Sequence, residues 1–331
     1  MNRVKLPEAR LRLAYFGTPE LARTILSAIL DENADDVVLV VCQPDKPKGR
    51  GNKLEAPPVK ELAIARGIPV VQPTKMKDGV LTAALKEQRI DLAIVAAFGR
   101  ILPQDMLDAP RFGCWNVHAS LLPQHRGASP IQQSLLDGDT ETGVTLMQMS
   151  AGLDEGPMLL EERIPIASDE TTPTLTEKLA GLGARLVLRG IREAKASGLT
   201  LTPQDNARAT FAPIIEKAAG KLDLTEPAIA LDRRIRALNP WPGTWIEVFG
   251  GEILKILPSL ENSASRGVEV GQEYGTPGSI LSVSGALQIA VGAGSLIIRA
   301  VQPAGKRPMA AADYLRGAGR SLTIGGRLGD R

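Results

Sequence analysis

The chain has 331 residues, of which 44% are hydrophobic and 23% are charged, a composition typical of globular proteins and a length sufficient for two domains. The net charge is +2, no run of eighteen apolar residues occurs, and the N-terminal segment is charged, so we expect a cytoplasmic protein without a membrane span. Cys42 and Cys114 lie in apolar runs, which favours buried free thiols over a disulfide framework.

The first half of the chain alternates strand-like and helix-like segments. Strands are predicted at 11–17, 37–42, 69–73, 91–99, 112–117 and 142–149, with helices near 19–30, 59–66, 79–88 and 127–138. Continuous Val, Ile, Leu and Ala runs between amphipathic helices predict a Rossmann-like, mostly parallel α/β sheet that is covered on both faces. Thr18 is the expected N-cap of the first helix.

The second half changes character after one further strand at 157–166 and a long amphipathic helix at 174–197. Residues 199–213 are polar, interrupted by prolines and weakly periodic, as expected of a linker. We therefore predict two domains, 1–205 and 206–331. In the second, a helix near 227–238 precedes five short β-runs with glycine-rich turns, which predict a small C-terminal β-barrel of OB-like type.

Two segments of the chain are locally basic. Residues 44–54 contain Lys46, Lys48, Arg50 and Lys53 against the single carboxylate of Asp45, and residues 299–327 are similarly rich in arginine and lysine. Two basic surfaces on a nearly neutral chain favour a polyanionic partner bound at defined places. A solvated basic face with a basic tail is the alternative.

One strand end concentrates polar groups suited to chemistry. Asn116 and His118 follow a predicted strand two residues apart, so strand alternation directs both side chains to one side. Ligands of doubly wound sheets collect beyond the carboxyl ends of the strands, and an amide beside an imidazole suits a developing oxyanion. Asp154, in the glycine-flanked segment GLDEG, could fix the imidazole tautomer, favour its charged form or carry a proton itself.

This set of groups suits transfer of an acyl-type group through a tetrahedral intermediate. Cys114 is predicted to be buried, so direct attack by an acceptor amine is simpler than a covalent enzyme intermediate. A histidine after a strand is more often structural than catalytic, however, and the Asn-x-His pair alone does not decide the question. The segment GTPE has one glycine where a dinucleotide fingerprint needs three, and CxxC, HExxH and Walker motifs are absent, so nicotinamide, metal and nucleotide-phosphate chemistry lack support.

Longer motifs favour a catalytic over a structural role for His118, because they resemble those of a known enzyme family. The pattern N-x-H-x-SLLP-x-x-RG at 116–127, followed by GLDEG, resembles the formyltransferases that use 10-formyltetrahydrofolate. Within them, QPDKPKGRGNKL and PPVK (43–60), NPWPGTW (239–245) and QPAGKRPM (302–309) resemble the methionyl-tRNA formyltransferase family. The resemblance extends over nearly the whole chain. Trp115 departs from it, standing where relatives carry a smaller aliphatic residue, and should pack under the sheet, away from Asn116 and His118.

The resemblance implies a reaction and a catalytic set. The formyl group of 10-formyltetrahydrofolate would pass to the α-amine of methionyl-initiator tRNA for translation initiation. Asn116 and His118 would stabilise the oxyanion of the tetrahedral intermediate, and Asp154 would orient and charge the imidazole and help to relay the amine proton. No metal is implied, and a monomer is expected.

The resemblance also implies binding residues. Two turns would hold the folate: Ser120, Leu121, Leu122, Pro123; Gly99, Arg100, Ile101, Leu102. For Ile101 and Leu102, ordinary core packing is the alternative. The tRNA would meet two basic groups of residues: Lys46, Lys48, Arg50, Lys53; Lys306, Arg307.

Two other functions remain open at this point. A formyltransferase of the same superfamily could act on a small amine, such as glycinamide ribonucleotide or an amino-sugar nucleotide, with the same catalytic triplet. Such an acceptor would need neither the basic insert nor a C-terminal domain. A non-catalytic RNA-binding protein would have no use for Asn116, His118 and Asp154.

Overall fold

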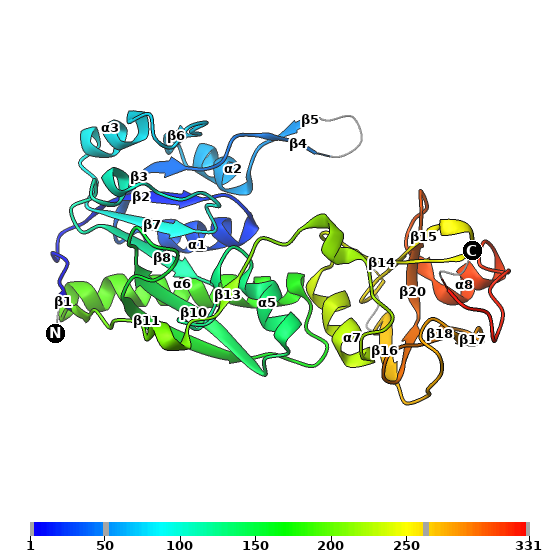
Figure 1. Ribbon diagram of the computed structural model, residues 1–331. Helices are drawn as coiled ribbons and strands as arrows, with labels where there is room; N and C mark the ends of the chain where they lie inside the picture. The colour runs from blue at the N-terminus through cyan, green and yellow to red at the C-terminus, as the bar shows by residue number, and fades with distance from the viewer. Residues whose placement is uncertain (1–2, 49–52, 261–264, 329–331) are drawn as a thin grey trace. The chain divides into compact units, whose positions relative to one another are not determined.

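The structure is a computed structural model that describes residues 3–48, 53–260 and 265–328. The chain divides into two compact units (Figure 1). The first consists of Met1–Pro130, Glu141–Pro165 and Thr176–Pro213; the second consists of Ile131–Thr140, Ile166–Leu175 and Ile214–Arg331. The predicted boundary after residue 205 lies within the last segment of the first unit and stays a prediction.

The described part of the first unit contains a seven-stranded sheet with the order β11-β10-β8-β7-β2-β3-β6. Neighbouring strands from β8 to β6 are parallel, whereas β10 runs antiparallel to β8 and to β11. The sheet strands are β2 (Arg12–Gly17), β3 (Asp36–Val41), β6 (Val70–Val71), β7 (Leu92–Ala96), β8 (Cys114–His118), β10 (Glu141–Gln148) and β11 (Met158–Pro165). The helices associated with them are α1 (Glu20–Glu32), α2 (Pro58–Ala65), α3 (Val80–Glu87), α4 (Gln104–Leu107) and α6 (Thr172–Ala196). The predicted mostly parallel α/β domain is confirmed.

Strand alternation divides the sheet residues between two apolar layers. On one face, Phe16 and Val95 join a buried cluster with residues of α3 and α4, such as Leu85 and Met106. On the other face, the Tyr15 hydroxyl donates to the Ala22 carbonyl of α1. Because both faces are buried, the inner strands β2 and β7 are apolar along nearly their whole length, which is why their sequences show no alternation.

Helix α6 packs closely against β8 through a glycine. A Cβ atom at Gly183 would lie 2.8 Å from Val117 Cγ1, closer than packed carbon atoms allow, and 3.2 Å from Ile25 Cδ1, which is a tight contact. Trp115, completely buried, also lies on this face, near Gly190 of the same helix. The predicted packing of Trp115 under the sheet is confirmed. Since Asn116 and His118 alternate with Trp115 and Val117, they project from the opposite face.

The second unit is rich in β-structure around its own core. Its described strands form two four-stranded antiparallel sheets, β14-β15-β20-β21 and β16-β19-β18-β17. Its strands are β14 (Thr244–Glu247), β15 (Ile253–Ile256), β16 (Val268–Gly271), β17 (Ile280–Ser282), β18 (Leu287–Ala290), β19 (Ser295–Ile298), β20 (Ala300–Pro303) and β21 (Met309–Ala310). Its helices are α5 (Pro130–Asp137), α7 (Ala228–Ala237) and α8 (Ala311–Arg316). The predicted β-rich C-terminal domain is confirmed, but one predicted β-run divides at Arg299, where the backbone leaves one sheet for the other.

Three local predictions need correction. The Thr18 hydroxyl donates to the Phe98 carbonyl and does not cap α1, whose N-cap is Pro19. The helix predicted from residue 127 begins at Pro130, because Arg126–Gly127 forms the short strand β9. The segment 199–213 contains two short strands, β12 (Leu199–Thr200) and β13 (Phe211–Ala212), which pair with β1 (Arg3–Val4) and β9. Within the described residues, no helix is both long and apolar enough to cross a membrane.

The packing of α6 yields a matched pair of substitutions. Gly183→Ala should lower the free energy of unfolding by about 1–3 kcal/mol, because the new methyl group overpacks the contact with Val117. Gly181→Ala, in the same helix, places its Cβ 3.7 Å from its nearest neighbour, the flexible Arg185 side chain. It should raise the free energy of unfolding by about 0.5–1 kcal/mol. Denaturant unfolding measures both, and equal stabilisation by the two alanines would refute the close approach.

Candidate active site

The carboxyl end of β8 lies between the neighbouring strands β7 and β10 and carries the predicted amide and imidazole. Asn116 stands opposite Met147 of β10 in the register of the sheet, and His118 stands opposite Thr145. Both side chains are largely buried, with 9% of Asn116 and 5% of His118 exposed. Regular strand geometry therefore fixes the spacing and direction of the two groups.

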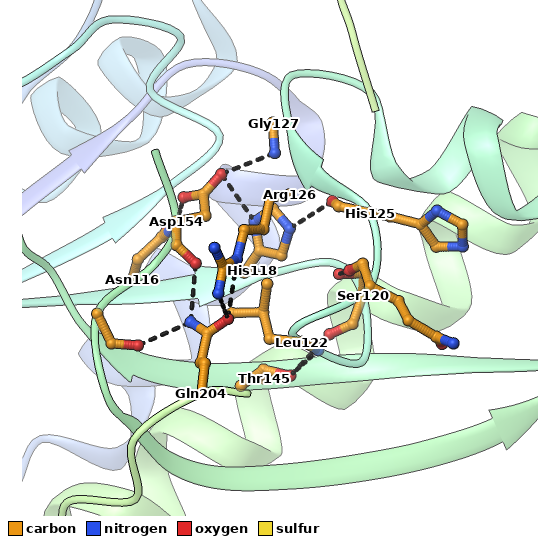
Figure 2. Close-up of polar contacts among 12 residues, drawn as sticks. Asn116, His118, Ser120, Leu122, His125, Arg126, Gly127, Thr145, Asp154 and Gln204 are labelled. Atoms are coloured by element: carbon orange, nitrogen blue, oxygen red, sulfur yellow. Dashed lines mark hydrogen bonds and ion pairs between the residues drawn. The ribbon is translucent and has the colours of Figure 1, made fainter. Parts of the chain in front are cut away.

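Asp154 reaches the same place from the loop between β10 and β11 (Figure 2). Its Oδ1 accepts a hydrogen bond from Asn116 Nδ2 at 3.3 Å, and its Oδ2 accepts one from the backbone N–H of Gly127 at 2.9 Å. Oδ2 also lies 3.8 Å from His118 Nδ1. The structure thus brings together the three predicted catalytic side chains, with the carboxylate touching the amide and facing the imidazole.

A backbone carbonyl fixes the other side of the imidazole. His118 Nε2 lies 3.0 Å from the carbonyl oxygen of His125. Because a carbonyl oxygen can only accept, Nε2 must carry the hydrogen of this bond. In the neutral ring Nδ1 is then the unprotonated nitrogen, and it is the one that faces Asp154. His125 and Asp154 both adopt left-handed backbone conformations, with φ of 57° and 48°, which are uncommon away from glycine and often mark functional loops.

The predicted folate turn after β8 is held rigidly from within. The Ser120 hydroxyl donates to the Gln124 carbonyl at 2.6 Å, so the side chain serves the turn itself. Thr145 Oγ1 donates to the Ser120 carbonyl and accepts from the Leu122 N–H. Leu121 and Leu122 are buried, and Leu122 is joined to Pro123 by a cis peptide bond.

The other predicted folate turn follows β7, the strand beside β8. Ile101 is 78% exposed, whereas Leu102 is buried in the core with residues of α3 and α4. Core packing is therefore the structural role of Leu102, and Ile101 is the apolar side chain available to a ligand. The Arg100 guanidinium donates to the Thr74 carbonyl. Gly99, at φ 76°, lies against the Gln43 side chain.

The predicted tRNA-binding residues are divided between the two units. Lys46 and Lys48 lie on β4 (Lys46–Lys48), which forms an antiparallel hairpin with β5 (Lys53–Glu55). The hairpin projects from the first unit (Figure 1). Arg50, between the two strands in the sequence, lies outside the described residues. In the second unit, Lys306 and Arg307 are exposed on the turn between β20 and β21.

A polar network fixes the base of this hairpin. Lys60 Nζ donates to both carboxylate oxygens of Asp45 at 2.8 Å, and Gln72 donates to Asp45 at 2.7 Å. These bonds, that of Gln72 first, lower the pKa of the Asp45 carboxyl below its usual value. Gln72 also donates to the Gln43 carbonyl, and the Gln43 amide donates to the Phe98 carbonyl. The base of the basic hairpin is thereby connected to the turn that begins at Gly99.

The cysteine nearest to the site is not a competent nucleophile. Cys114 is buried at the start of β8, and burial raises the pKa of its thiol to about 12. Burial likewise raises the pKa of the Cys42 thiol to about 11. A thiol that stays protonated at neutral pH is a poor nucleophile, so these two residues do not support a covalent thioester route.

Two further side chains were missed by sequence reasoning. Thr145 is completely buried on β10, where a threonine in an apolar strand gave no signal of its bonds to the turn after β8. Gln204 contacts the backbone of the Asp154 loop (Figure 2), although it lies in the segment predicted to be a linker. Only knowledge of strand pairing could have indicated either contact.

Comparison with known proteins agrees with this architecture. The profile of the family described as formyl transferase matches residues 11–191, and that described as formyl transferase, C-terminal domain, matches residues 214–319. Among solved structures, HypX from Aquifex aeolicus in complex with tetrahydrofolic acid is similar in fold, with a TM-score of 0.62 and 16% identity, over 93% of this chain and 47% of that one. An N-formyltransferase from Helicobacter canadensis, in complex with folinic acid and dTDP-3-aminofucose, has a TM-score of 0.62 and 17% identity over 88% of this chain and 99% of that one.

Curated sequences give a narrower assignment. A methionyl-tRNA formyltransferase from Myxococcus xanthus is 49% identical over 93% of this chain and 96% of its own length. Another from Alcanivorax borkumensis is 45% identical over 97% of this chain and 95% of its own length. Together with the two matching domain profiles, this identity over nearly the full length shows that the chain belongs to the methionyl-tRNA formyltransferase family.

Proposed function

We propose that Asn116, His118 and Asp154 carry out the formyl transfer by which this chain, an enzyme of that family, formylates methionyl-tRNA for translation initiation. The observation that supports this most strongly is the contact of the Asp154 carboxylate with the Asn116 amide and its position facing the imidazole. An amide, an imidazole and a carboxylate at one strand end supply oxyanion donors and a proton acceptor.

The reaction we propose is a direct transfer between two nitrogen atoms. The α-amine of the methionyl group attacks the formyl carbon on N10 of 10-formyltetrahydrofolate, and a tetrahedral intermediate forms. The bond from the carbon to N10 then breaks, the amine loses a proton and N10 gains one. An amide carries two N–H donors, so Asn116 can hold Asp154 with one and the oxyanion with the other.

In this proposal Nδ1 of His118 is the nitrogen that faces the substrate. Nε2 is occupied with the His125 carbonyl, whereas Nδ1 lies 3.8 Å from Asp154 Oδ2, too far for a direct hydrogen bond. A protonated Nδ1 beside the carboxylate can therefore donate to the substrate oxygen. Asp154 stabilises the charged ring, accepts the proton released by the amine, directly or through water, and helps to relay it to N10 of the folate.

The donor we propose is 10-formyltetrahydrofolate, held between the Gly99 turn and the Ser120–Pro123 turn. Membership of a folate-dependent family supports this choice, as do the folate ligands of structural relatives. Since the Ser120 hydroxyl and Leu102 serve internal packing, the protein would contribute mainly backbone groups and the exposed face of Ile101.

We propose that the acceptor is the initiator form of methionyl-tRNA and that the enzyme binds it in the cytoplasm. The basic hairpin with Lys46, Lys48, Arg50 and Lys53 would meet phosphates near the acceptor end, and Lys306 and Arg307 would contact the backbone elsewhere. The network at the base of the hairpin supports this role, because Lys60 and Gln72 hold Asp45 and so brace the start of β4.

Removing any member of the catalytic set should slow turnover. Asn116→Ala, His118→Ala and Asp154→Ala should each lower kcat by at least about 100-fold, since an oxyanion donor contributes about 10²–10³ and acid–base assistance about 10²–10⁴. Steady-state formylation assays measure the loss, and circular dichroism verifies the fold. Glu155→Ala, an exposed carboxylate on the same loop, is the control and should retain activity. Near-normal turnover of any of the three variants would remove that residue from the mechanism.

The basic hairpin can be tested through salt dependence. Neutralising Lys46, Lys48, Arg50 and Lys53 together should weaken tRNA binding and reduce the slope of log K against log salt by about three, at roughly 0.7 per phosphate contact. Arg185→Gln with Arg192→Gln, two exposed changes on α6, is the control and should leave the slope unchanged. An unchanged slope in the hairpin variant would show that the hairpin does not touch the tRNA backbone.

Acceptor specificity distinguishes this proposal from its alternatives. With 10-formyltetrahydrofolate as donor, we expect formylation of charged initiator tRNA to exceed that of elongator methionyl-tRNA, with no turnover of glycinamide ribonucleotide. Comparable rates on both tRNAs would contradict the initiator preference. Turnover of glycinamide ribonucleotide alone would favour a small-amine transferase, and tRNA binding without turnover would favour an RNA-binding protein.

A further inference from the structure

The carboxamide of Gln204 uses its full hydrogen-bonding capacity at the catalytic loop (Figure 2). Its Nε2 donates to the Asp154 carbonyl at 2.8 Å and to the Gly156 carbonyl at 2.7 Å. Its Oε1 accepts from Arg126 Nε at 3.0 Å and from Arg126 Nη2 at 2.7 Å. Two carbonyls can only accept and a guanidinium can only donate, so only one orientation of the amide forms all four hydrogen bonds.

These bonds act on the backbone of a residue in an uncommon conformation. Asp154 has φ 48°, a left-handed geometry that costs a non-glycine residue free energy unless its surroundings impose it. Gln204 holds the carbonyl of that same residue and the carbonyl two residues further on. The direction of the Asp154 side chain, and with it the 3.8 Å separation from His118 Nδ1, depends on this backbone geometry.

The segment that follows Gln204 supports the opposite side of the site. β13 pairs in parallel with β9, Arg126 opposite Phe211 and Gly127 opposite Ala212. Thr210 Oγ1 accepts from the His125 N–H at 2.9 Å. The approach is so close at Gly127 that a Cβ atom there would lie 2.6 Å from the Ala212 carbonyl oxygen. The segment therefore fixes the backbone around two groups of the site. These are the His125 carbonyl, which orients His118, and the Gly127 N–H, which orients Asp154.

Arg126 links the two sides. It is 4% exposed, and its guanidinium donates to Gln204 and to the Asn206 side chain at 2.8 Å. Since a buried guanidinium needs acceptors, Gln204 satisfies Arg126 while it holds Asp154. One amide thus ties the strand β9, which supplies the Gly127 N–H, to the loop that supplies the carboxylate.

We infer that Gln204 is a positioning residue for formyl transfer, which acts by holding the Asp154 loop in its catalytic geometry. The inference rests on the catalytic role proposed for Asp154. It assigns a function to a segment whose composition indicated only a linker. The amide group is required, and a side chain of the same size does not replace it. In Gln204→Glu one carboxylate oxygen can still accept from Arg126, but the other faces the carbonyls of Asp154 and Gly156 and repels them.

The test compares Gln204→Glu with a matched control in the full-length protein. Gln204→Glu should lower kcat at least tenfold, with KM for both substrates within about threefold of wild type and the thermal midpoint preserved within a few degrees. Gln204→Ala, which removes both the donor and the acceptor, should lower kcat similarly. Gln104→Glu, where the exposed amide donates to Asp108, is the control and should leave kcat unchanged.

A double-mutant cycle with Asp154→Asn distinguishes positioning from a general structural role. If Gln204 acts through Asp154, Gln204→Glu should cost less than threefold in kcat once Asp154 has been replaced. The inference would be overturned if Gln204→Glu lowered kcat tenfold in the Asp154→Asn background as well, so that the two losses multiplied. Wild-type kcat in the single variant Gln204→Glu would also overturn it. If Asp154→Asn alone retains normal turnover, the proposed catalytic set fails, and this outcome is separate from failure of the inference.

Discussion

The hydrogen bond between His118 Nε2 and the His125 carbonyl is the interaction on which the proposed chemistry of the site depends. A carbonyl oxygen has no proton to give, so in the neutral ring the bond places the hydrogen on Nε2 and leaves Nδ1 without one. Nδ1 faces Asp154. A carboxylate and an imidazole alone would leave the tautomer open, whereas the backbone decides it.

The fold keeps this bond in place by rigid supports on several sides. Regular pairing of β8 with β7 and β10 fixes the imidazole and the amide, and the close approach of α6 at Gly183 fixes the strand from beneath. Thr145 holds the turn after β8 by two hydrogen bonds. Sites placed at the ends of rigid strands keep their geometry better than sites built on free loops. Asp154, which does come from a loop, has its own support from Gln204.

Sequence reasoning recovered what depends on local periodicity. The apolar runs gave the parallel sheet, and alternation along β8 correctly placed Asn116 and His118 on one face with Trp115 on the other. A resemblance to known formyltransferases was needed to choose between a catalytic and a structural histidine, because one histidine near an amide carries little information by itself.

What the sequence could not give depends on contacts between distant segments. Gln204 meets residues about fifty positions earlier in the chain, and its surroundings of proline and polar residues indicate only a loop. The same limit explains the error at Thr18, whose hydroxyl bonds to Phe98 across the sheet in place of capping the adjacent helix. Local propensity favoured the cap, and tertiary pairing overrode it.

The most direct measurement is the tautomer of His118, which is accessible because the chain contains only two histidines. Long-range proton–nitrogen NMR spectra of protein labelled with ¹⁵N-histidine report the protonation of each ring nitrogen, and a His125→Asn variant assigns the signals. We expect the neutral His118 ring to carry its hydrogen on Nε2, hydrogen-bonded to the His125 carbonyl, with Nδ1 bare. A neutral ring protonated at Nδ1, with Nε2 bare, would contradict this expectation.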